Sequence, residues 1–120
     1  MGQKYFSMEV IKVLGKVSPS ATTLTTLYTV PTDKGAVVSS LNICNRDTYD
    51  ATIRIAIYRT ESPASADYLE YNMMVYGNCS AQRLKGVTMA QGDIVSIYAS
   101  SEHISFQLFG SEFDQTFEYP

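Results

Sequence analysis

Three isoleucines alternate with polar or small residues in the segment Thr52-Ile53-Arg54-Ile55-Ala56-Ile57-Tyr58. Successive side chains of a β-strand point to opposite faces, so this period of two predicts a strand with one buried face and one solvated face. Because Tyr58 lies on the face opposite the isoleucines, we expect its ring to be exposed. No stretch of helical length carries apolar residues at a helical spacing, which disfavours folds that alternate strands with helices.

Further segments have the composition or the alternation of strands, and turn-forming residues separate them about every ten residues. They are 8–14, 24–30, 37–44, 69–75, 94–100 and 104–109. Alternation places Val95 and Ile97 opposite Tyr98, and it places Leu69 on one face with Tyr71, Met73 and Val75. Seven or eight short strands predict an all-β antiparallel β-sandwich, either Ig-like or jelly-roll.

The length of 120 residues favours one domain with one hydrophobic core. Apolar residues make up 45% of the chain and charged residues 18%, a balance typical of globular proteins rather than disordered ones. We expect the β-sandwich over residues 14–112, an N-terminal arm or first strand over 1–13, and an acidic C-terminal tail over 113–120. The N-terminus lacks the apolar core of a secretory signal, which predicts synthesis and use in the cytosol.

The scattered basic residues argue against a nucleic acid partner, and the short apolar runs argue against a membrane partner. The net charge is −3, and the nine lysines and arginines are scattered, so no basic stripe is available to follow a phosphate backbone. The longest apolar runs are only a few residues long, whereas a membrane-spanning helix needs about 20. We therefore predict neither partner.

The residues suited to nucleophilic or metal chemistry do not form a known motif. His103 is the only histidine, and it follows Ser101 and Glu102 in a turn, whereas the members of a catalytic triad converge from separate segments. Cys44 and Cys79 lie outside any CxxC motif and away from the histidine in sequence, so we expect packed free thiols. A disulfide between them is the alternative, and it would require an oxidising compartment.

Acidic residues offer only generic candidates for catalysis or metal binding. A glycosidase needs two carboxylates across a cleft, for which the chain offers Asp67, Glu70, Asp93 and Glu112 among its twelve acids. Calcium-loop spacing is suggested by Asn45, Asp47 and Asp50, but the required glycine and closing glutamate are missing, which favours an Asx-type turn. The glycines are too dispersed to cradle a phosphate. The sequence predicts no catalytic residue, no metal site and no cofactor.

Tyrosine is abundant, with nine copies and no tryptophan. Tyrosine provides rigid amphipathic contact area at protein interfaces, although half-buried strand tyrosines are an equally good interpretation. The candidate interface residues are the two strand tyrosines expected on outward faces and the aromatic residues near the chain ends: Tyr58, Tyr98, Tyr5, Phe6, Phe117 and Tyr119.

Several segments resemble small virion structural proteins of tailed bacteriophages, over residues 14 to 112. In the first half they are Leu14-Gly15, Ser18-Pro19-Ser20-Ala21-Thr22-Thr23, Leu27-Tyr28-Thr29-Val30-Pro31, Ala36-Val37-Val38-Ser39-Ser40-Leu41 and Cys44-Asn45-Arg46. In the second half they are Arg54-Ile55-Ala56, Tyr68-Leu69-Glu70-Tyr71, Gly86-Val87-Thr88-Met89, Gly92-Asp93-Ile94-Val95, Tyr98-Ala99-Ser100, Ile104-Ser105-Phe106 and Phe109-Gly110.

This resemblance implies a non-enzymatic β-sandwich that packs in multiple copies on a phage particle, as a tail, neck, fibre-attachment or capsid-decoration component. Its partners would be copies of itself and other virion proteins, and its location would be the virion, assembled in the host cytoplasm. The residues outside the resemblance, at both chain ends, would act as arms that tie neighbouring subunits together.

A second resemblance gives the alternative interpretation. The turn Gly92-Asp93 before a strand and the ending Phe106 to Gly110 look like the closing strands of trimeric jelly-roll heads of the complement and tumour-necrosis-factor type. That resemblance implies a trimeric tip that binds a host surface receptor or a glycan.

Overall fold

A computed structural model of the chain describes residues 9–115, and it contains nine strands and one 3-10 turn. The strands are β1 (Glu9–Val17), β2 (Thr25–Thr29), β3 (Lys34–Asn45), β4 (Ala51–Tyr58), β5 (Tyr68–Val75), β6 (Ser80–Arg83), β7 (Val87–Ala90), β8 (Ile94–Ala99) and β9 (Ile104–Asp114). The 3-10 turn, η1 (Ser65–Asp67), lies between β4 and β5. The all-β prediction is confirmed, with nine strands where seven or eight were expected.

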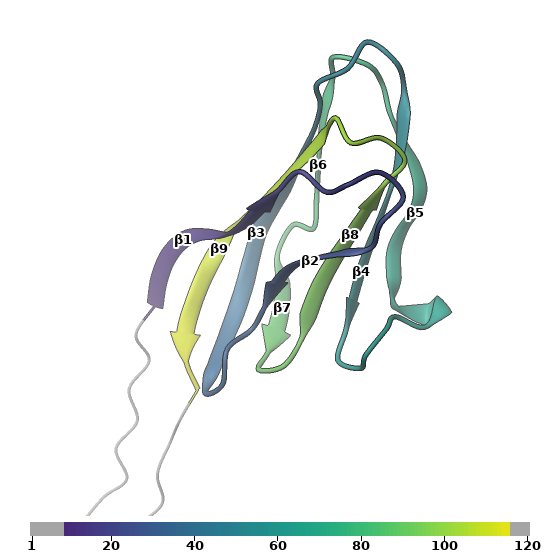
Figure 1. Cartoon of the computed structure of the whole chain (residues 1–120). Coiled ribbons are helices and arrows are strands. Elements are labelled where there is room, and N and C mark those ends of the chain that lie inside the picture. Colours follow the sequence, from purple (N-terminus) through teal and green to yellow (C-terminus); the bar gives the residue numbers. More distant parts are fainter. Residues whose placement is uncertain (1–8, 116–120) are drawn as a thin grey trace, which may run out of the picture.

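The strands form two antiparallel sheets that face each other (Figure 1). The five-stranded sheet has the order β1-β9-β3-β6, with β7 also paired to β3, and the four-stranded sheet has the order β2-β8-β4-β5. The pairs β1–β9, β2–β8, β3 with β6 and β7, and β4–β5 are those of one long hairpin rolled into two layers. This is the jelly-roll form of the β-sandwich.

Side chains from the inner faces of both sheets form one hydrophobic core. Alternation predicted the inward residues of three strands correctly. The residues expected to point inward are fully buried: Ile53 and Ile55 of β4, Val95 and Ile97 of β8, and Ile104, Phe106 and Leu108 of β9. Each of these strands lies between two others: β4 between β8 and β5, β8 between β2 and β4, and β9 between β1 and β3. An unbroken period of two therefore gives the buried face directly.

Strand β5 departs from the predicted alternation. Leu69 and Tyr71 are 50% and 58% exposed, whereas Met73 packs against the core and Val75 is buried. The register with β4 shifts twice, so that Leu69 and Asn72 have no partner of their own, and Asn72 adopts a left-handed φ of 58°. Each such β-bulge inserts one residue and reverses the alternation beyond it. The expectation that these residues share one face is therefore wrong.

Strands β6 and β7 were not predicted. They are four residues each, and β3 pairs with both of them along its length. The segment between them contains left-handed φ values at Leu84 (63°) and Gly86 (70°), and the Gly86 N–H donates to the carbonyl oxygen of Val38 at 2.8 Å. The pair thus acts as one interrupted strand at the edge of the five-stranded sheet.

The expected domain boundaries fall inside strands. The boundary between residues 13 and 14 lies within β1, and the boundary between residues 112 and 113 lies within β9. Residues 9–13 therefore belong to the first strand rather than to an arm, and Phe113 and Asp114 belong to β9 rather than to a tail. Within residues 9–115, no helix is long and apolar enough to cross a membrane.

Candidate interaction surfaces

Strand β1 forms a free edge of the five-stranded sheet and carries apolar side chains that are exposed to solvent. Val10, Ile11 and Val13 are exposed, with Ile11 at 86%. From Glu9 to Val13 the strand pairs with β9 in continuous register, and its other side has no partner strand within the described residues. A regular edge of this kind has unpaired backbone groups that can accept a further strand.

The outer face of the same sheet continues this apolar surface. Ile11 lies opposite Ser111 and Val13 lies opposite Phe109, so they share an outward face with these β9 residues. Two residues beyond Ser111, the ring of Phe113 packs over Gly35, where an added Cβ would come within 2.6 Å of the ring. We call Ile11, Val13, Phe109 and Phe113 the outer apolar patch.

A polar cluster of Tyr28, Glu112 and Lys12 connects β1 to β9 and β2. The Tyr28 hydroxyl of β2 donates to one carboxylate oxygen of Glu112 at 2.5 Å, and the Lys12 ammonium of β1 donates to the other at 3.2 Å. The hydrogen bond from Tyr28 and the Lys12 ammonium hold the pKa of Glu112 below its usual range, although burial acts in the opposite direction. Burial, together with the Glu112 carboxylate, raises the pKa of Tyr28 above its usual range. The cluster therefore consists of a neutral phenol, a carboxylate and an ammonium.

The second surface lies on the outer face of the four-stranded sheet. Arg54 of β4 lies directly opposite Tyr71 of β5 and Tyr98 of β8. Its guanidinium carbon is 4.2 Å from the ring centroid of Tyr71 and 4.3 Å from that of Tyr98, so the cation is stacked between two aromatic rings. Arg54 also donates through Nε to the side-chain oxygen of Asn72 at 2.8 Å.

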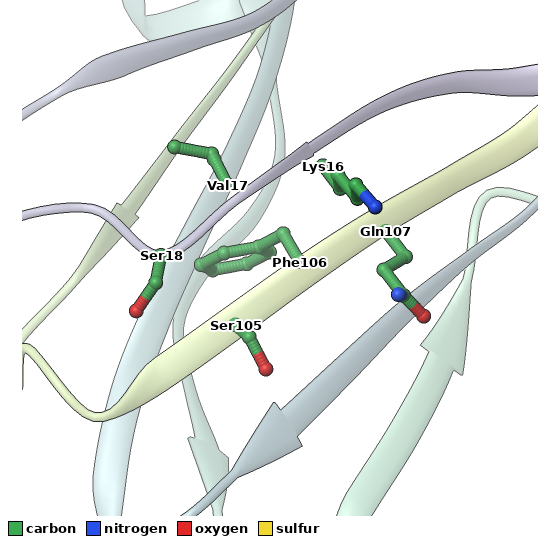
Figure 2. Close-up of a pocket in the computed structure, with 6 residues that line it drawn as sticks. All are labelled: Lys16, Val17, Ser18, Ser105, Phe106 and Gln107. Atoms are coloured by element: carbon green, nitrogen blue, oxygen red, sulfur yellow. The ribbon is translucent and has the colours of Figure 1, made fainter.

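Beside this stack is an open hollow of about 450 Å³, lined by Pro63, Ser65, Tyr68 and Tyr71. The rings of Tyr68 and Tyr71 meet edge to face, with their centroids 5.0 Å apart. A second hollow, of about 220 Å³, lies where the end of β1 meets the start of β9 (Figure 2). It is lined by Lys16, Val17, Ser18, Ser105, Phe106 and Gln107, and its aromatic residue, Phe106, belongs to the core.

Of the predicted interface residues, Tyr58 is buried, which corrects the expectation of an exposed ring. It is 8% exposed, and its hydroxyl forms a hydrogen bond of 2.8 Å with the Ser96 hydroxyl. Small neighbours on the outward face, Ala56 and Ser96, leave room for the ring to lie against the sheet. Tyr98 is half-buried under Arg54. Tyr5, Phe6, Phe117 and Tyr119 lie outside the described residues.

Within the described residues, the side chains considered for nucleophilic chemistry form no hydrogen bond between a nucleophile and a base. The Ser101 hydroxyl accepts a hydrogen bond from the His103 backbone N–H at 3.1 Å, and the His103 imidazole lies 3.9 Å from the Asp47 carboxylate. The structure places Cys79 at the surface and Cys44 half-buried, both as free thiols. The expectation of a packed thiol is thus wrong for Cys79.

The candidate acids each have a separate structural partner. Asp67 accepts from the backbone N–H of Ala64 in η1, Glu70 pairs with Arg83, and Asp93 pairs with Arg59. The Asn45, Asp47 and Asp50 side chains bond to backbone groups of their own loop and of the β5–β6 turn, as in an Asx-type turn. Among the described residues, no group of three or more His, Cys, Asp or Glu side chains could hold a metal ion.

Comparison with protein-family models, with curated proteins and with solved structures finds no match for this chain. Its function is therefore argued from the geometry of the two surfaces. The edge and outer patch of β1 were not predicted as a site, because residues 1–13 were expected to be an arm or a first strand and only Tyr5 and Phe6 were named there as interface residues. The alternation of Ile11 and Val13 with Lys12 was the available signal. The hollow at Tyr68 and Tyr71 depends on the bulge at Leu69, which leaves no clear sequence signal.

Proposed function

We propose that this chain is a non-enzymatic structural subunit of a tailed-bacteriophage particle, in which copies of the chain associate through β1. The sequence resemblance supplies the virion context, and jelly rolls occur among viral capsid domains, which supports it at the level of fold analogy. The observation that carries the proposal is the apolar edge of β1, which is in continuous register from Glu9 to Val13 before its bulge at Leu14, with Ile11 almost fully exposed. Exposed edges are normally blunted by charge, proline or bulges, because otherwise they pair with other chains.

The proposed contact joins the β1 edge of one copy to a strand of another, with the outer apolar patches adjoining. Main-chain hydrogen bonds across such an edge add affinity, and burial of Ile11 and Val13 adds about 25 cal/mol per Å² of apolar surface removed from water. The charge of Lys12, whose side chain is 44% exposed, is paired with the Glu112 carboxylate at 3.2 Å, which reduces its opposition to this contact.

Native mass spectrometry of the purified chain, alone and mixed with the products of neighbouring genes, tests this proposal. We expect oligomers or hetero-complexes for the wild type and mainly monomer for Ile11→Lys, because a lysine at the edge opposes strand pairing. Tyr49→Lys is the matched control, because Tyr49 is 78% exposed in the loop between β3 and β4, away from the β1 edge. A wild-type chain that stays monomeric in every mixture would contradict the proposal.

The alternative, a trimeric tip that binds a host receptor or glycan, draws support from the jelly-roll pairing and from the aromatic hollow on the four-stranded sheet. The oligomer size distinguishes the two. A trimer that ignores the neighbouring gene products supports the tip, whereas rings or complexes with another virion protein support the structural subunit.

A further inference from the structure

The hollow beside η1 has the size and lining of a small-ligand site. Its volume of about 450 Å³ lies within the roughly 300–1,000 Å³ of such sites. Two tyrosine rings supply apolar faces, and Ser65 with the tyrosine hydroxyls supplies polar groups that can donate and accept hydrogen bonds. This combination suits a ligand that is both hydroxylated and partly apolar.

The bulge at Leu69 in β5 creates this lining. In a regular strand, residues three apart point to opposite faces, so Tyr68 and Tyr71 would be separated by the sheet. The register shifts pair Tyr71 with Arg54 and Tyr68 with Ala56, and both partners lie on the outward face of β4. Bulges commonly re-aim side chains next to functional sites. Here the inserted residue Leu69 brings the rings of Tyr68 and Tyr71 together on one surface.

Tyr71 is fixed in position and yet displayed to solvent. One contact is the Arg54 guanidinium over its ring, and another is the edge-to-face contact with Tyr68. Arg54 is in turn held by Tyr98 and by the Asn72 side chain. Tyr71 nevertheless remains 58% exposed. A ring that is already immobilised loses little conformational entropy when a ligand stacks on it, so this arrangement is preorganised for binding.

The wall of the hollow formed by Pro63 and Ser65 is also ordered by local contacts. Asp67 N–H donates to the Ala64 carbonyl oxygen at 3.0 Å, and the Ala64 N–H donates to the Asp67 carboxylate at 2.8 Å. These two bonds close the 3-10 turn η1. The loop therefore holds Ser65 beside Tyr68 without needing a ligand to shape it.

We propose that this hollow binds a saccharide, whose ring stacks on Tyr71 and whose hydroxyl groups bond to Ser65 and to the tyrosine hydroxyls. A pyranose offers an apolar C–H face and a rim of hydroxyls, which matches the mixed lining. A nucleic acid fits less well, because the chain carries a net charge of −3 and Arg54 is engaged between two rings. The site does not depend on self-association, since β1 and β5 are edges of different sheets.

Ligand-observed saturation-transfer NMR on the full chain tests the site. The probes are maltotriose, chitotriose, lactose and sialyllactose, with oligothymidylate as the nucleic-acid probe. We expect at least one saccharide to give a signal with the wild type, and we expect Tyr71→Ala to weaken its affinity by about tenfold or more. Tyr71→Phe keeps the ring and should retain most of the binding.

The control variant is Tyr49→Ala, which removes an exposed tyrosine elsewhere and should bind as the wild type does. Ile11→Lys should also bind normally, so a failure of self-association and a failure of this site can be told apart. Absence of any saccharide signal, or a signal that survives Tyr71→Ala, would overturn the proposal. A signal from oligothymidylate alone would overturn it as well and would assign the surface to base stacking.

Discussion

Strands β1 and β5 are both edges of the sandwich, but their exposed sides are built differently. From Glu9 to Val13, β1 pairs with β9 in continuous register and presents apolar side chains. By contrast, β5 contains two inserted residues among its eight, one of them with a left-handed backbone. Bulges twist an edge away from further strands, and the single bulge of β1 lies at Leu14, so its segment from Glu9 to Val13 is the edge suited to chain pairing. The irregularity of β5 instead places Tyr68 and Tyr71 together on the outer face of the four-stranded sheet.

The comparison shows that exposed apolar residues of this domain are suited to two different kinds of contact. At β1 the apolar side chains accompany unpaired backbone groups along an edge in continuous register from Glu9 to Val13. At β5 the exposed Tyr71 is held by a cation and by a second ring, so its free surface has a fixed position. The first geometry accommodates another strand, and the second accommodates a compact ligand.

The largest expected effect is the difference in stability between a core variant in β4 and a variant in β5, and it tests whether β5 is irregular. Ile55→Ala in β4 should lower the free energy of unfolding by about 2–5 kcal/mol, because it opens a cavity in the core. Leu69→Ala in β5 should change it by less than about 0.5 kcal/mol, because Leu69 is exposed. Urea unfolding of both variants measures the difference. Equal losses would mean that Leu69 faces the core and that β5 is as regular as β1.

The next effect concerns the anchor of β1. Glu112→Gln should lower the free energy of unfolding by about 1–3 kcal/mol at neutral pH, because the hydrogen-bonded carboxylate between Tyr28 and Lys12 is lost. The folded pKa of Glu112 is depressed, so its stabilisation is present above the unfolded pKa of about 4.3 and disappears as the pH falls through the folded value.

Unfolding curves at neutral and acid pH should therefore lie closer together for Glu112→Gln than for the wild type. Glu61→Gln, at an exposed glutamate in the loop after β4, serves as the control. If both variants keep the wild-type dependence on pH, the Glu112 cluster does not anchor this edge.

The smallest effect addresses the bulge at Asn72. Asn72→Val should destabilise the fold by about 1–2 kcal/mol, because a β-branched residue disfavours the left-handed φ of 58°, whereas Asn72→Gly should be tolerated. Thermal unfolding compares the two variants. A valine variant as stable as the glycine variant would show that β5 can straighten and that the contrast with β1 is not fixed by the backbone.

The strands that could be predicted are those whose local pattern is complete. The isoleucines of β4 and the residues Ile104, Phe106 and Leu108 of β9 reveal both the strand and its buried face, since alternation depends only on neighbouring residues. Strands β6 and β7 could not be found in this way, because four residues are too few to establish a period, and a left-handed turn separates them.

The sequence by itself determined the all-β class, the single core and the inward faces of β4, β8 and β9. Only the tertiary structure decided that the sandwich is a jelly roll, that Tyr58 lies buried against Ser96, and that Tyr71 faces solvent beside Tyr68. The physical reason is that strand pairing and register depend on the partner strand. A bulge forms where two paired segments differ in length, and no alternation within one segment records the length of the other.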